Sequence, residues 1–165
     1  MKILQVISHY LPAIKFGGPL QVAHGLGVAL DDLGHTVSIC TTNLASPSEW
    51  LDVSLEEPAL IDDVHVYYAD SRFLRYWGFS AQLARNILRE ARHSDVILIH
   101  FHYQFASVVG GWCARYLNKP YVIFTHGSLN ENGISLKGSR YKRAYLKYLE
   151  KKNFDGALFT AYHSQ

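Results

Sequence analysis

The fold prediction rests on one stretch, VILIHFHY at residues 96–103. Residues 96–101 are almost wholly apolar and rich in β-branched side chains, as is typical of a strand that is covered on both faces. Residues 2–7 and 121–125 form two more short apolar runs of the same kind. Strands of this type belong to a parallel sheet that lies between two layers of helices.

Helical segments alternate with these strands. Pro19 suits the first position of a helix, and apolar residues recur at helical spacing up to Leu33, before the capping residue Gly34. Ser80 is expected to cap a helix that runs to His93. The other predicted elements are strands at 36–41, 64–69 and 156–161 and helices at 105–117 and 139–152. The order predicts an α/β fold, a Rossmann-like, doubly wound and mostly parallel sheet with helices on both faces.

Residues 43–63 break this pattern. They contain Pro47 and Pro58 and are rich in acidic side chains. We expect an irregular and mobile excursion over the surface.

The composition predicts one soluble domain that spans residues 1–165, since 48% of the side chains are hydrophobic and 18% are charged. No apolar run approaches the roughly 18 residues of a membrane span, and the first residues lack the pattern of a signal peptide. Cys40 and Cys113 lie in apolar surroundings, which suits a reducing compartment. These features predict a cytoplasmic protein.

Positive charge is concentrated between Lys137 and Lys152, where seven cations accompany a single acid, Glu150. Within 139–152, apolar residues at 141, 144, 145, 148 and 149 form one helical stripe. We favour a helix that packs on the core and exposes a basic face, because one stripe cannot face both the core and a membrane. The alternative is a peripheral contact with anionic lipid at the cytoplasmic face of a membrane. Nucleic acid is not a predicted partner, since stacking aromatics are sparse beyond the tyrosines.

Polar residues collect just after the predicted strands. They are Ser8, His9 and Tyr10 after the first strand, His100, His102 and Tyr103 around the end of 96–101, and His126 and Gly127 after 121–125. Ligands of such sheets bind beyond the carboxyl ends of the strands. The sequence therefore predicts a site at this edge.

Gly17 and Gly18 precede a helix, where backbone N–H groups and the helix dipole favour an anion such as phosphate. A flexible surface turn is the alternative. Gly25 and Gly27 lack the third glycine of the dinucleotide fingerprint, and the chain has neither a P-loop nor a G-x-S-x-G motif. Nicotinamide dehydrogenases, P-loop enzymes and hydrolases of that type are disfavoured.

Two histidine motifs leave alternatives open. Strand alternation would put His100 and His102 on one face as a metal pair, but no partner ligands stand out nearby, so no metal is predicted. His126 before Gly127 is expected to project its ring into the crevice, and the alternative is a loop histidine bonded to a neighbouring carbonyl group.

Taken in order, several segments resemble a known family. They are Gly17-Gly18, the helix end at 33–37, residues 95–97 leading to His102, and residues 120–122 leading to His126 and Gly127. Together, from Met1 to about Phe159, they look like the N-terminal domain of GT-B glycosyltransferases of the retaining group called family 4.

The resemblance implies transfer of a sugar from a nucleoside-diphosphate sugar to an acceptor hydroxyl by a hexosyltransferase, without a metal or cofactor. It assigns Gly17, Gly18 and Gly127 to the donor phosphates and sugar, His126 to a catalytic contact with the donor sugar, and His102, His9 and Tyr103 to the acceptor. Such enzymes act in polysaccharide or glycolipid biosynthesis.

The resemblance also implies a second, nucleotide-binding domain, which residues 1–165 do not contain. We therefore expect the acceptor-side half of an enzyme, inactive or nearly so until a C-terminal domain or a partner subunit completes it. One alternative is a non-catalytic acceptor-binding or membrane-anchoring subunit that a separate nucleotide-binding chain completes. A weaker one is a nucleotide-sugar epimerase.

Overall fold

The computed structural model describes residues 1–46, 48–72, 77–126 and 145–161. Its main sheet has seven strands in the order β5-β6-β2-β1-β7-β8-β9. Their bounds are β1 Lys2–Val6, β2 Thr36–Thr42, β5 Ala59–Ile61, β6 Val64–Ala69, β7 Val96–His100, β8 Tyr121–Phe124 and β9 Phe159–Ala161. Every pairing in this sheet is parallel except that of β5 with β6. The predicted Rossmann-like, doubly wound sheet is confirmed.

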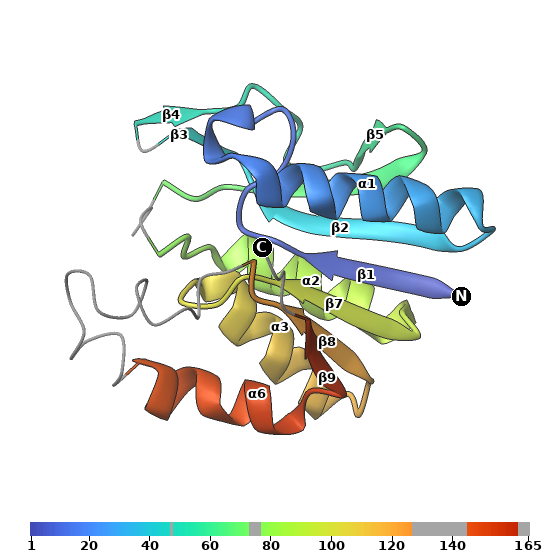
Figure 1. The fold of residues 1–165 in the computed structure, drawn as a ribbon. Helices are drawn as coiled ribbons and strands as arrows, with labels where there is room; N and C mark the ends of the chain where they lie inside the picture. The colour runs from blue at the N-terminus through green and yellow to red at the C-terminus, as the bar shows by residue number, and fades with distance from the viewer. Residues whose placement is uncertain (47, 73–76, 127–144, 162–165) are drawn as a thin grey trace.

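Helices cover both faces of the sheet (Figure 1). Their bounds are a 3-10 turn η1 at Ile14–Phe16, α1 Gly18–Asp32, α2 Ala81–His93, α3 Phe105–Tyr116, a π-helical segment η2 at Leu146–Glu150, and α6 Lys151–Gly156. Helix α1 packs with the side chains of Ile3 and Ile39, whereas α2 and α3 pack with Leu4 and Val6 on the other face. Side chains alternate along a strand, so β1 contributes to both cores.

The helix boundaries follow local signals in the sequence. The Ser80 hydroxyl accepts a hydrogen bond from the Leu83 N–H at 3.1 Å and so caps α2 as predicted. Pro19 lies in the first turn of α1, and Gly34 after its end has a φ of 82°. These signals act within a few residues, which is why they are readable without the tertiary structure.

The prediction of an irregular excursion at 43–63 was wrong in two places. Leu44–Ser46 (β3) pairs with Glu49–Trp50 (β4) in a small antiparallel sheet, and β5 adds an antiparallel edge to the main sheet. These strands have only two or three residues. They are too short to show an alternating pattern in the sequence.

The predicted basic helix is described from residue 145 onward, and residues 139–144 lie outside the described part of the chain. Tyr145 is buried, but Tyr148 is 73% exposed and Leu149 is 43% exposed. The π-helical turn brings Glu150, five residues after Tyr145, to the buried side. The predicted stripe was therefore wrong at 148 and 149, because it assumed regular α-helical spacing.

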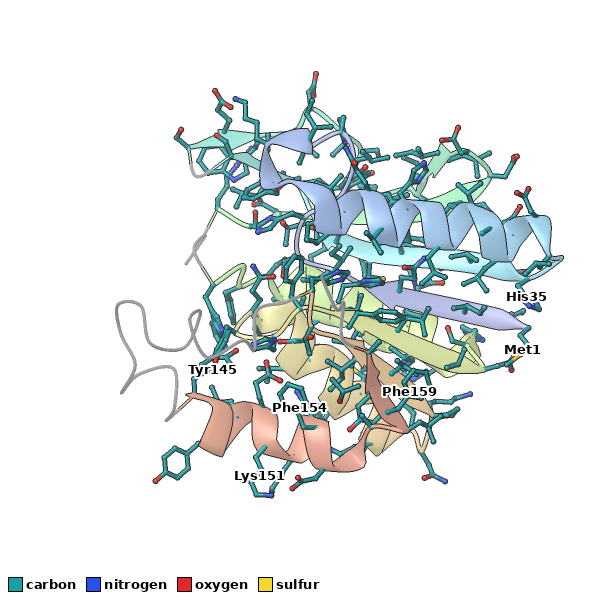
Figure 2. All side chains as sticks on the ribbon, in the orientation of Figure 1. Met1, His35, Tyr145, Lys151, Phe154 and Phe159 are labelled. Carbon is teal, nitrogen blue, oxygen red and sulfur yellow. The ribbon has the colours of Figure 1, made fainter. Side chains whose placement is uncertain are left out.

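The helix beyond this turn runs to Gly156, past the predicted end at Lys152. Figure 2 shows the side chain of Phe154 directed toward the sheet and that of Lys151 directed away from it. Lys151 pairs with Asp155 at 2.5 Å on the exposed face. Among the described residues, no helix is both long and apolar enough to span a bilayer.

Candidate functional site

The sheet reverses its direction of winding between β1 and β7, which are neighbours in the strand order. Chain connections leave this point in opposite directions, so the segments that follow the two strands diverge and leave a crevice at their carboxyl ends. Residues 8–18 follow β1, residues 101–104 follow β7, and residues 125–126 follow β8. The predicted gathering of strand-end residues at one edge of the sheet is confirmed for those that the structure describes.

Three non-glycine residues at this edge have a left-handed backbone. Their φ angles are 70° for Phe101, 66° for Tyr103 and 48° for His126. A side chain in this region costs about 1–3 kcal/mol, and such residues cluster where function holds them in place. The left-handed backbone at these residues changes the direction of the side chains at the ends of β7 and β8.

His100 and His102 do not form a pair, because the backbone turns at Phe101. The Nδ1 atom of His100 lies 3.0 Å from the Nε2 atom of His126. The Nε2 atom of His100 lies 2.7 Å from the Oε1 atom of Gln5. His102 instead packs on Tyr103, with ring centroids 4.2 Å apart. The alternation argument for a metal pair was therefore wrong. Within 1–46, 48–72, 77–126 and 145–161, no three His, Cys, Asp or Glu residues are grouped as metal ligands would be.

Three neighbouring rings contact the ring of His126. Its ring stacks with those of His100, at a centroid distance of 5.2 Å, and Phe124, at 6.2 Å, and it meets Phe101 at 4.9 Å. Burial, followed by the proximity of His126, lowers the pKa of His100 to about 3. His100 is therefore neutral at physiological pH.

His9 lies on the opposite side of the crevice. Its ring stacks on Phe16 with a centroid distance of 3.7 Å, and burial lowers the pKa of His9 to about 4. Together with Leu20, Phe101 and Gln104, these two rings line a pocket of about 290 Å³. The pocket is largely apolar, and its polar groups are a neutral imidazole and an amide.

Gly17 is the N-cap of α1 and Gly18 its first residue, directly after Phe16 of the pocket lining. Gly17 has a φ of 87°, which favours glycine, and a Cβ added at either position would meet no atom within 4 Å. The side of the helix N-terminus on which these Cβ atoms would lie is thus open, while the Gly17 N–H itself donates to the Ile14 carbonyl at 3.1 Å. Gly127, the third glycine predicted to contact the donor, lies outside the described residues.

A buried carboxylate supports the segment that carries His102 and Tyr103. Glu150 accepts hydrogen bonds from the Tyr103 N–H at 3.2 Å, the Ser107 hydroxyl at 2.5 Å and the Asn153 amide at 2.7 Å. Burial raises the pKa of Glu150, and these hydrogen bonds partly oppose that rise. The carboxylate ties the loop after β7 to the helical segment of 145–156.

Sequence reasoning missed Gln5 and Glu150 as parts of this edge. Gln5 is the single polar side chain within the apolar run of 3–7, and that contrast is a signal that could have found it. Glu150 is the only acid in a basic segment. Its burial depends on the π-helical turn, so no periodicity in the sequence points to it.

The fold and the site together define the N-terminal domain of a GT-B glycosyltransferase. The sequence model of Glycosyltransferase Family 4 matches residues 16–160, and the chain belongs to that family. A comparison with curated proteins finds no match.

Solved structures agree with the fold. The structure of HepE from Anabaena in complex with UDP is 18% identical, with a TM-score of 0.59 over 97% of this chain and 37% of its own. HepE in complex with UDP-glucose is also 18% identical, with a TM-score of 0.54 over 98% of this chain and 43% of its own. The chain thus spans less than half of the length of these neighbours.

Proposed function

We propose that residues 1–165 are the acceptor-side half of a retaining glycosyltransferase that moves a hexosyl group from a nucleoside-diphosphate sugar to an acceptor hydroxyl. The carrying observation is the convergence of the His126 ring, the aromatic pocket and the open N-terminus of α1 at one edge of a Family 4 domain. Binding of UDP and UDP-glucose by structures of the same fold supports this donor class.

In the proposed reaction, the bond between the sugar C1 and the β-phosphate oxygen breaks while the acceptor oxygen bonds to C1. The departing nucleoside diphosphate takes the acceptor's proton, so no side-chain base is required. The N–H group of Gly18 and the dipole of α1 stabilise the charge that develops on the phosphate, while Gly17, whose N–H donates to the Ile14 carbonyl, leaves room for the donor beside the helix. No metal ion is needed in this scheme, because neutralisation comes from the protein.

The histidines have different proposed roles. His126 contacts the donor sugar, and His9, His102 and Tyr103 orient the acceptor. A neutral His9 ring stacked on Phe16 suits a sugar, whose hydroxyl groups hydrogen-bond and whose C–H face packs on aromatic rings. Gly127 is proposed to assist the donor contact, as the resemblance implies.

A second domain completes the enzyme in this proposal, because most nucleotide contacts in GT-B enzymes come from their other half. The 165-residue chain alone is then expected to bind a sugar nucleotide weakly and to transfer no sugar. Acceptors of the cytoplasmic face, in polysaccharide or glycolipid synthesis, are the proposed substrates.

The test is an NMR titration of the chain with UDP-glucose, with release of UDP measured in parallel in the presence of candidate acceptors. We expect shifts of the Gly18 amide and the His126 ring, loss of the ring-dependent shifts in His126→Ala, and no turnover. His65→Gln is the matched control, since His65 is exposed at the amino end of β6, the other edge of the sheet. Absence of shifts at both residues would refute the donor site, and robust transfer by the chain alone would refute the need for a second half.

A further inference from the structure

The aromatic pocket contains two buried polar atoms that form no hydrogen bond with any residue that the structure describes. They are Nδ1 of His9 and Oε1 of Gln104, and both residues line the pocket of about 290 Å³. Buried polar groups in native proteins are nearly always paired, because an unpaired one loses its bonds to water without a replacement. Two such atoms in one pocket indicate a ligand that completes their hydrogen bonds.

The backbone of Gln104 is fixed by its neighbours, whereas its amide group is not. Gln104 is the N-cap of α3, but its side chain does not cap the helix. Its backbone carbonyl accepts hydrogen bonds from the Ser107 hydroxyl at 2.7 Å and from the Tyr145 hydroxyl at 3.3 Å. These bonds hold residue 104 in place at the end of the crevice, so the amide meets a ligand in a defined position.

The two polar groups of the pocket are uncharged and each can both donate and accept. Burial lowers the pKa of His9 to about 4, so at physiological pH its imidazole offers one N–H donor and one accepting nitrogen. The Gln104 amide offers an accepting oxygen and an NH₂ donor. A hydroxyl group also donates and accepts, so it can pair with either residue. A carboxylate or phosphate only accepts, and it would leave the amide oxygen unpaired.

No side-chain cation balances an anion in this pocket. None of its described lining residues carries a charge. Lys15 precedes Phe16 of the lining, but its ammonium group pairs with the Glu49 carboxylate at 2.7 Å. Since an ion is costly to bury without a partner charge, the pocket disfavours a charged ligand.

We propose that Gln104 is a specificity-determining residue that, together with His9, selects an uncharged sugar ring with free hydroxyl groups as the acceptor. This inference rests on the proposed acceptor role of this side of the crevice and names the class of group that it takes. Acceptors whose first ring carries a carboxylate or a phosphate are excluded by the same two residues.

The size and the walls of the pocket agree with a single ring. Its volume is just below the roughly 300–1,000 Å³ of typical ligand pockets, so it fits one sugar unit and not a longer oligosaccharide. The rings of Phe16 and Phe101 supply apolar surface for the C–H groups of a sugar. The Phe101 ring also lies 4.9 Å from the ring of His126, which brings a bound acceptor beside the proposed donor contact.

The test compares methyl β-D-glucoside with methyl β-D-glucuronide, which has the same ring but carries a carboxylate at C6. Both are titrated into the chain at pH 7.5 without sugar nucleotide, and binding is followed in ¹H–¹⁵N NMR spectra. The side-chain NH₂ signals of Gln104 are identified by their loss in Gln104→Met. We expect the glucoside to shift these signals and the glucuronide to bind at least about 10-fold more weakly.

Gln104→Met keeps the length of the side chain but removes its hydrogen-bonding groups. One lost hydrogen bond corresponds to an affinity loss of about 2- to 10-fold for the glucoside. The preference for glucoside over glucuronide should fall by a similar factor, and a merely structural role of Gln104 would leave this ratio unchanged. Gln21→Met makes the same change at an exposed glutamine of α1 and should alter neither affinity nor ratio.

Three results would each overturn the proposal. They are unshifted Gln104 side-chain signals at saturating glucoside, equal affinities of the wild-type chain for the two glycosides, and an unchanged ratio in a folded Gln104→Met chain. The first two use the wild-type chain alone, so they decide the proposal even if the variant fails to fold.

A parallel titration with UDP-glucose separates this inference from the proposed function. Absence of shifts at Gly18 and His126 with UDP-glucose would refute the donor site, while the glycoside titration still decided the selectivity of the pocket. Shifts at both residues together with equal glycoside affinities would retain the donor site and refute the role of Gln104.

Discussion

Acidification should destabilise this domain through two histidines that the fold keeps neutral. The pKa of His100 is lowered to about 3 and that of His9 to about 4, from an ordinary value of 6.5. Between these values and pH 6.5, the unfolded chain binds protons that the folded chain does not. Stability is therefore complete above pH 6.5 and is lost as the pH falls toward the folded-state pKa values.

The size of the effect follows from linkage. At pH 5, each histidine removes about 2 kcal/mol from the free energy of unfolding, so the two together remove about 4 kcal/mol relative to pH 8. This is a large part of the roughly 5–15 kcal/mol that stabilises a typical domain. Glu150 has the opposite effect on the pH dependence. Burial raises the pKa of its carboxyl group, so the stability that it contributes is present at low pH and is lost as the pH rises.

Urea unfolding followed by circular dichroism at pH 8, 6 and 5 measures the effect. The difference between pH 8 and pH 5 should shrink by about 2 kcal/mol in His100→Gln, which lacks the titrating group, and Glu150 is the same in both chains. His65→Gln should retain the full difference. An equal pH dependence in His100→Gln and the wild-type chain would show that the His100 ring is not held neutral by the fold.

Four substitutions test the cap, the packing and the buried carboxylate by urea unfolding at pH 7.5. Ser80→Ala should cost about 1 kcal/mol, because α2 loses its N-cap, and an unchanged midpoint would contradict that role. Gly111→Ala should cost more than about 1–3 kcal/mol, since its Cβ would lie 2.2 Å from the Asn153 amide oxygen. Gly25→Ala, in open space on α1, should stabilise by about 0.5–1 kcal/mol, and similar effects at both glycines would refute the packing argument. Glu150→Ala should cost about 2–4 kcal/mol and broaden the Tyr103 amide signal, because it leaves buried donors without their acceptor. A sharp, unshifted Tyr103 signal would refute the tie between the two segments.

The parts of the fold that were predictable are those encoded over short distances. Apolar runs such as 96–100 identify buried strands because both of their faces are covered, and the cap at Ser80 acts within one helical turn. The carboxyl edge follows from the parallel order of the strands alone, so the sequence suffices to place His9, His102 and His126 at one edge.

The errors come from backbone geometry that the sequence does not display. Strand alternation put His100 and His102 on one face, but the positive φ of Phe101 ends the strand between them. Regular helical spacing predicted that Tyr148 is buried, but the π-helical turn places Glu150 on the buried side and leaves Tyr148 exposed. In both cases tertiary contacts stabilise a conformation that the local residues do not prefer, and the departures lie next to the candidate site.

The location of the buried polar groups explains why the site needs this fold. Gln5 and His100 belong to β1 and β7, the two strands between which the sheet reverses its winding, and their bond joins these strands side chain to side chain. A polar pair in the core costs stability unless it is satisfied, and an apolar pair would pack there at no such cost. A hydrogen bond that extends from this pair to His126 gives the polar core a use at the edge where ligands bind. The buried His100 ring whose neutrality makes the domain sensitive to acid is thus the same ring that contacts His126 at this edge.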